Sequence, residues 1–158
     1  MKRVYCAGPD VFSVNRENIF KYMKKLCVHH HLEALIPFDS DGSNPTSKAI
    51  YENNIALLSS ADYVVANLNA FRGKEPDSGT CFEVGFAIAR GIPVIGYTII
   101  GNWAQHIGIV NHTLDGLPLC EEKQIVEDFG LPLNLMLAES SMIVRSFPDA
   151  IQKISEIK

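Results

Sequence analysis

The chain has 158 residues, a length that suits one compact domain and leaves little room for a second hydrophobic core. Apolar residues make up 47% and charged residues 20%, which excludes a disordered chain. The 14 Lys and Arg against 18 Asp and Glu give a net charge of −4, which provides no general attraction for nucleic acid or anionic membranes. We therefore expect a single domain over residues 1–158, with no nucleic acid partner and no membrane partner.

Apolar run lengths and cysteine spacing indicate the compartment. The longest apolar runs are far shorter than the roughly 18 residues that span a bilayer. Residues 1–3 lead directly into a strand-like segment, which is too short for a signal peptide. Cys6, Cys27, Cys81 and Cys120 are widely spaced and lack the paired spacing of a zinc site. We expect a cytoplasmic protein with four reduced thiols and no metal.

Strand-like and helix-like patterns alternate along the chain. The predicted strands are short, mostly apolar runs over residues 2–7, 32–38, 63–68, 92–98 and 142–145. The predicted helices have apolar residues at helical spacing, over about residues 15–28, 46–60, 80–90, 133–137 and 148–157. Residues 101–132 are poorly periodic, and we expect loops and short helices there. The alternation predicts an α/β sandwich around a parallel sheet of about five strands.

Three predicted loops are candidates for ligand binding. In open parallel sheets the ligand crevice lies beyond the carboxyl ends of the strands, which selects residues 8–13, 39–44 and 69–79. The chain has neither of the glycine-rich phosphate-binding motifs of dinucleotide and ATP enzymes. We therefore expect neither a dinucleotide nor ATP as a cofactor, and we predict that the protein uses no cofactor at all.

Reactive side chains are densest in residues 71–83, where a strand end leads into a helix. Glu83 stands in the first turn of a predicted helix that is apolar around most of its circumference, so we expect a buried helix and a partly desolvated carboxylate. Two readings remain open. Thr80 and Glu83 fit a capping box, and Asp77 fits a turn or cap residue. Alternatively, Asp77 and Glu83 address one ligand from two sides.

Five segments carry a family pattern: residues 4–12, 53–55, 61–68, 71–85 and 130–136. Their most specific part is the string Glu-Pro-Asp-x-Gly-Thr-x-Phe-Glu-Val-Gly. In order, and over essentially the whole chain, they resemble the nucleoside 2-deoxyribosyltransferases, in the group that favours purines. The resemblance implies a flavodoxin-like (Rossmann-like) three-layer sandwich. It also implies cleavage of the N-glycosidic bond of a deoxynucleoside.

The resemblance implies roles for the reactive residues. Glu83 matches the family's nucleophile and Asp77 its acid–base aspartate beside the departing base. Tyr5 matches a tyrosine whose hydroxyl orients the nucleophile. Asn134 and Met136 match residues that reach into the neighbouring subunit's site, which implies a homo-oligomer of at least two chains.

Further residues are assigned to substrate binding. Asp10 and Phe12 follow the first strand and are placed to meet the sugar or the base, although Phe12 also suits a core position. Gly79 belongs to the specific string. Asn54 stands where some family members carry an aspartate, which leaves its role open. Arg72 suits a phosphate contact or a solvated loop position.

The resemblance implies transfer of 2-deoxyribose between nucleobases in purine salvage, and the residue types suit that chemistry. Departure of the base creates positive charge at the sugar's C1′, which a carboxylate stabilises and then traps. A covalent deoxyribosyl-Glu83, followed by attack of a second base, retains the β anomer. Asp77 would protonate the leaving base, so the scheme needs Glu83 ionised and Asp77 available as an acid.

Two other functions remain open. A deoxynucleoside 5′-monophosphate N-glycosidase would use water and hold a phosphate, for which Ser13 and Arg16 are available. The neutral Asn134 favours a free 5′-hydroxyl instead. A non-catalytic nucleoside-binding module would have no need of both Glu83 and Asp77.

Overall fold

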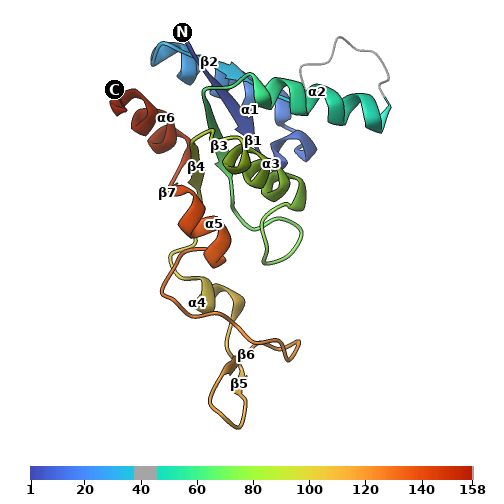
Figure 1. The fold of residues 1–158 in the computed structure, drawn as a ribbon, viewed down its shortest axis with the longest axis vertical. Coiled ribbons are helices and arrows are strands. Elements are labelled where there is room, and N and C mark those ends of the chain that lie inside the picture. Colours follow the sequence, from blue (N-terminus) through green and yellow to red (C-terminus); the bar gives the residue numbers. More distant parts are fainter. Residues whose placement is uncertain (38–45, 158) are drawn as a thin grey trace.

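A computed structural model of the chain describes residues 1–37 and 46–157. Its main sheet is parallel and has five strands in the order β2-β1-β3-β4-β7 (Figure 1). The strands are β1 (Lys2–Ala7), β2 (Leu32–Leu35), β3 (Tyr63–Asn67), β4 (Val94–Tyr97) and β7 (Met142–Val144). This order is that of flavodoxin-like folds, and it confirms the predicted architecture.

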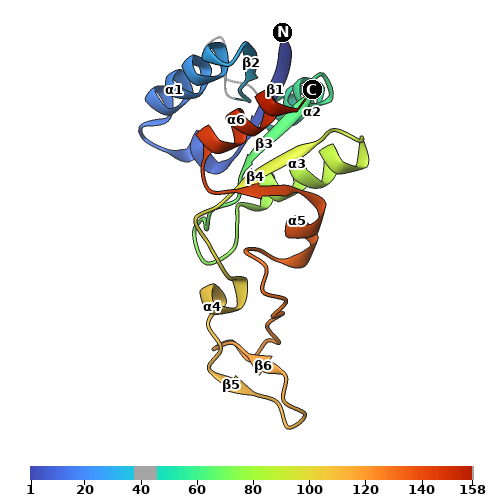
Figure 2. The same cartoon turned by 90° about the vertical axis from the view of Figure 1, so that its left-hand side faces the viewer.

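Helices cover both faces of the sheet, which gives the three layers (Figure 2). They are α1 (Arg16–His29), α2 (Ser47–Ser59), α3 (Ser78–Ala89), α5 (Leu135–Ser140) and α6 (Phe147–Glu156). Because side chains alternate along a strand, β1 serves both layers. Val4 and Cys6 pack with α1 and α6, whereas Tyr5 and Ala7 pack in the cluster that contains residues of α2 and α3. Tyr5 therefore faces the helix that carries Glu83.

The predicted helices and strands are present, with shifted ends. The second strand ends at Leu35, three residues earlier than expected. The candidate loop over residues 39–44 lies outside the described residues. A short 3-10 helix, η1 (Pro9–Phe12), occupies the first candidate loop. In the described part of the chain, no helix has the length and apolar character needed to cross a membrane.

The aperiodic segment forms an arm that extends away from the sheet (Figures 1 and 2). It holds a short helix, α4 (Trp103–Ile107), and a two-stranded antiparallel ribbon of β5 (Asn111–His112) and β6 (Pro118–Leu119). The ribbon was not predicted, because two-residue strands are too short to show an alternating pattern. A small core of its own stabilises the base of the arm, where Ala104, Cys120 and Val126 are buried.

The α3 helix was expected to be buried, and the structure buries it only in part. Phe82 is 52% exposed and Ile88 38% exposed. Tyr51 of the neighbouring α2 is also exposed, and its ring lies 6.3 Å from that of Phe82. The apolar circumference of α3 therefore has two surfaces, one packed on the sheet and one that the described residues leave uncovered.

Candidate functional site

The centre of the site is a contact between β1 and α3. Tyr5 is fully buried in β1, and its hydroxyl donates a hydrogen bond to Oε1 of Glu83 over 2.6 Å. The two residues are 78 positions apart in the sequence. The bond fixes one carboxylate oxygen of Glu83, and Oε2 has no hydrogen bond to any residue that the structure describes.

Burial controls the electrostatics of this pair. Desolvation raises the pKa of the Glu83 carboxyl to about 7; the Tyr5 hydrogen bond acts against this rise, and the charge of Asp77 adds to it. Burial, and then the nearby charge of Glu83, raise the pKa of the Tyr5 phenol well above its ordinary value, so the phenol stays protonated and acts as a donor. The sequence predicted a partly desolvated Glu83 carboxylate, and the structure agrees, because burial outweighs the stabilising hydrogen bond. The predicted reaction needs the ionised form of Glu83, which the raised pKa disfavours.

Asp77 is the N-cap of α3. Its Oδ2 accepts hydrogen bonds from the backbone N–H and the hydroxyl of Thr80, both at 2.9 Å. The proposed Thr80–Glu83 capping box is therefore wrong: α3 begins at Ser78, which places Glu83 in the second turn. Among the described residues, Oδ1 of Asp77 has no hydrogen bond, so the capping role leaves one oxygen available. A Cβ on Gly79 would lie 3.2 Å from Oδ2 of Asp77.

Asp10 lies at the carboxyl end of the sheet in η1. Its Oδ2 accepts a hydrogen bond from Nδ2 of Asn67, at the end of β3, over 3.1 Å. The two segments approach closely at Gly8, where a Cβ would lie 2.9 Å from Cβ of Asn67. Sequence reasoning missed this role of Asn67, although its place at the end of a predicted strand was a usable signal.

Phe12 is not a core residue, since 56% of it is exposed. Its ring stacks on Phe71 with 5.5 Å between centroids, and the Arg72 guanidinium lies 4.9 Å from the Phe12 ring and 4.7 Å from the Phe71 ring. Arg72 adopts a left-handed backbone conformation with φ 49°. The Arg72 side chain is exposed, as the solvated-loop alternative predicted, and its guanidinium also packs on two aromatic rings.

Asn54 lies on α2, and its Oδ1 is buried without a hydrogen bond among the described residues. A buried amide oxygen without a donor is unfavourable by about 1–3 kcal/mol. This is the situation expected of a side chain that meets a donor from outside the chain.

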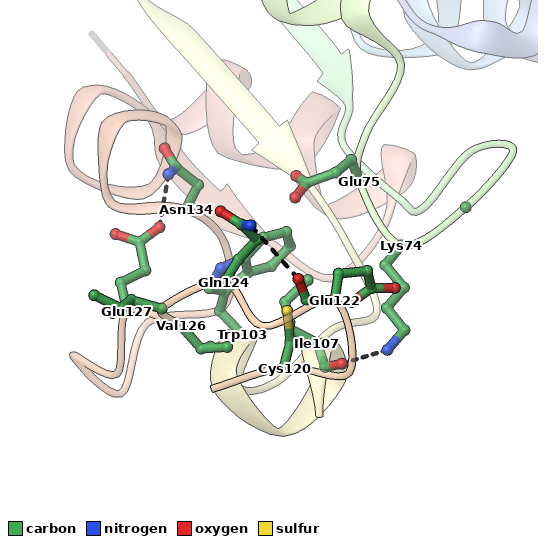
Figure 3. Close-up of a pocket in the computed structure, with 12 residues that line it drawn as sticks. Lys74, Glu75, Trp103, Ile107, Cys120, Glu122, Gln124, Val126, Glu127 and Asn134 are labelled. Carbon is green, nitrogen blue, oxygen red and sulfur yellow. Dashed lines mark hydrogen bonds between the residues drawn. The ribbon is translucent and has the colours of Figure 1, made fainter. Parts of the chain in front are cut away.

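Asn134 and Met136 lie at the start of α5 and have no hydrogen bond to Tyr5 or Glu83 among the described residues. Asn134 is the N-cap of α5, and Met136 is 70% exposed, so it is not the core residue that its type suggests. Asn134 lines a cavity of about 650 Å³ between the loop over residues 73–75 and the arm (Figure 3). Neither Tyr5 nor Glu83 lines this cavity. One chain thus brings Tyr5, Asp77 and Glu83 together, and Asn134 lines a cavity that these three residues do not line.

The described residues contain no group of three or more His, Cys, Asp or Glu side chains that would hold a metal ion. All four cysteines are free thiols.

Comparison with known proteins identifies relatives. The pattern of the nucleoside 2-deoxyribosyltransferase family matches residues 4–136. A 2-deoxyribosyltransferase from Leishmania mexicana is 32% identical, with a TM-score of 0.83 over 99% of both chains. A CMP N-glycosidase from Clostridium botulinum is 15% identical, with a TM-score of 0.51 over 97% of both chains, a likeness that shows the fold alone. An uncharacterized Schizosaccharomyces pombe protein is 31% identical over 106 residues, which are 62% of this chain and 50% of that protein. The match thus spans half the length of this curated relative.

Proposed function

Because the chain belongs to the nucleoside 2-deoxyribosyltransferase family, we propose that it transfers 2-deoxyribose between nucleobases through a covalent intermediate on Glu83. The observation that carries this proposal is the hydrogen bond of 2.6 Å between the buried Tyr5 hydroxyl and the Glu83 carboxylate. A carboxylate held at one oxygen and free at the other is the arrangement that a glycosyl nucleophile needs.

The first half of the reaction breaks the bond between C1′ and the base nitrogen. Oε2 of Glu83 attacks C1′ as the electron pair of that bond leaves with the base, and Asp77 supplies a proton to the base. The Tyr5 hydrogen bond stabilises the ionised form of Glu83 until the ester forms. A nitrogen of a second base then attacks C1′ from the vacated face as the ester bond between C1′ and Glu83 breaks and its electron pair returns to the carboxylate. The incoming base gives a proton to Asp77. Two inversions at C1′ retain the β anomer.

The raised pKa of Glu83 has a consequence for this step. With a pKa of about 7, roughly half of the free enzyme carries the nucleophilic carboxylate at neutral pH. A desolvated carboxylate is also a stronger nucleophile than a hydrated one. Burial therefore lowers the ionised fraction of Glu83 and raises the reactivity of the carboxylate that remains ionised.

We also propose that the active unit is a homo-oligomer in which Asn134 and Met136 complete a neighbouring site. Three observations support this: Met136 is exposed, Glu83 does not line the cavity beside Asn134, and α3 presents Phe82 and Ile88 to solvent. The substrates on this account are deoxynucleosides and free bases, mainly purines, and the setting is purine salvage in the cytoplasm.

One assay tests the proposed function against its alternatives. Deoxyinosine is mixed with adenine, and products are separated by chromatography, with Glu83→Gln as the inactive control. We expect deoxyadenosine and hypoxanthine. Deoxyribose and free base would indicate a hydrolase, an alternative that the shared fold of the CMP N-glycosidase keeps open. Binding without any product would indicate a nucleoside-binding module.

A further inference from the structure

The side-chain amide of Asn134 is held from two sides. Its Nδ2 donates a hydrogen bond to Oε1 of Glu127 over 2.6 Å, and its Oδ1 accepts one from the backbone N–H of Met136 over 3.0 Å. The same Glu127 oxygen also accepts from the backbone N–H of Leu135 at 3.2 Å. Glu127 thus decides which end of the amide is the donor, and it ties the start of α5 to the arm. The other N–H of Asn134 has no acceptor within residues 1–37 and 46–157, so it remains for a ligand.

The cavity around Asn134 has an acidic lining. Figure 3 shows Glu75, Glu122 and Glu127 around the same space. Lys74 is the one cation among the described lining residues, and its ammonium group donates to the carbonyl of Ile107. Desolvation raises the pKa of Glu75, and the charge of Glu127 adds to this rise, whereas His106 lowers it. The charges of Glu75 and Glu127 therefore act on the same space.

Resting on the function proposed above, we propose that Glu127 is a positioning residue that orients Asn134 toward the substrate's 5′-hydroxyl and that its charge selects nucleosides over nucleoside 5′-monophosphates. A phosphate at the 5′ position would bring a dianion close to the Glu127 carboxylate, and like charges repel. Tight phosphate sites present cations or several N–H and O–H donors. Here the lining cation is engaged by a carbonyl, and the amide of Asn134 has one N–H to offer.

Three variants separate orientation from charge. Glu127→Ala removes both the acceptor and the charge. Glu127→Gln keeps an acceptor oxygen for Asn134 and removes the charge. Asp128→Asn removes a neighbouring exposed charge that makes no hydrogen bond to Asn134, and it is the matched control.

The measurement is kcat and KM for deoxyinosine and for deoxyinosine 5′-monophosphate, with adenine as acceptor. We expect Glu127→Ala to raise KM for deoxyinosine roughly three- to tenfold, the effect of one hydrogen bond, with kcat changed less. Glu127→Gln should recover most of that KM and should reduce the preference for the nucleoside about tenfold. Asp128→Asn should retain the wild-type preference.

An unchanged preference in Glu127→Gln, or an unchanged KM in Glu127→Ala, would overturn the inference. Calorimetric binding of the same two ligands to Glu83→Ala, with and without Glu127→Gln, gives the preference independently of turnover. If wild type transfers no deoxyribose but this binding preference depends on Glu127, then the proposed function fails and the inference about Glu127 stands.

Discussion

Replacing Glu83 with Gln should make the protein more stable at neutral and alkaline pH. The carboxylate is buried beside Tyr5, and burial raises its pKa from an ordinary value of 4.5 to about 7. A raised carboxyl pKa means that the folded state holds a proton that the unfolded state releases. Wild type therefore loses stability as pH rises from about 4.5 to about 7, and Glu83→Gln does not.

The size of the effect follows from the shift. Each pH unit between the two pKa values is equivalent to about 1.4 kcal/mol, so the shift of Glu83 corresponds to about 3 kcal/mol. For a chain of this length that difference is on the order of 10 °C in Tm. Gln retains an oxygen that accepts the Tyr5 hydroxyl, so the substitution removes the charge and little else.

The assay is urea unfolding between pH 4.5 and 8.5 at one protein concentration. Wild type is compared with Glu83→Gln and with Glu33→Gln, a substitution of an exposed glutamate on β2. The free energy of unfolding of Glu83→Gln should exceed that of wild type by an amount that grows by about 3 kcal/mol across this range. The free energy of unfolding of Glu33→Gln should change with pH in the same way as that of wild type. Parallel curves for Glu83→Gln as well would refute the desolvated state of this carboxyl.

Three further predictions concern activity. In wild type the acidic limb of the pH profile of kcat/KM should have a pKa near 7. Tyr5→Phe should raise that pKa by about one pH unit, because a hydrogen bond that stabilises the ionised Glu83 is lost. An unchanged pKa in Tyr5→Phe would contradict this. Asp77→Asn should slow the release of adenine from deoxyadenosine roughly 10²–10⁴-fold in single turnover. It should slow a 7-methylated purine deoxynucleoside far less, because that base leaves without protonation. Equal losses for both substrates would mean that Asp77 acts only as a helix cap. Glu83→Ala and Asn134→Ala chains are mixed in equal amounts, allowed to exchange subunits and assayed below KM. The mixture should recover about a quarter of wild-type activity, because half of the dimers are mixed and each mixed dimer has one intact site of two. No recovery would count against a site shared between subunits.

The fold was predictable because its signals are local. Apolar strand runs and helical spacing each extend over several residues, and parallel pairing follows from their alternation. The start of α3 was misplaced because Asp77 and Thr80 are both good caps. The hydrogen bond that the Thr80 N–H donates to Asp77 shows that Asp77 is the cap, and this bond cannot be read from the sequence.

The site was predictable from the sequence only in its residue types. Spacing says nothing about Tyr5 and Glu83, and their pairing entered through the family resemblance. The partial desolvation of Glu83 was predicted from the apolar helix around it, but the size of its pKa shift depends on burial in the packed layers. Glu127 was missed as well, since it acts on Asn134 from an aperiodic arm that carries no motif.

The most direct test of the account is to trap the covalent intermediate. A 2′-fluorinated purine deoxynucleoside, whose glycosyl-enzyme turns over slowly, is incubated with wild type, Tyr5→Phe and Glu83→Gln, and each protein is denatured and weighed. Wild type should gain the mass of one fluorinated sugar, and peptide mapping should place it on Glu83. Tyr5→Phe should gain it more slowly, and Glu83→Gln should gain none. Release of base from wild type without any added mass, or a label on another residue, would contradict the role of Glu83 as nucleophile.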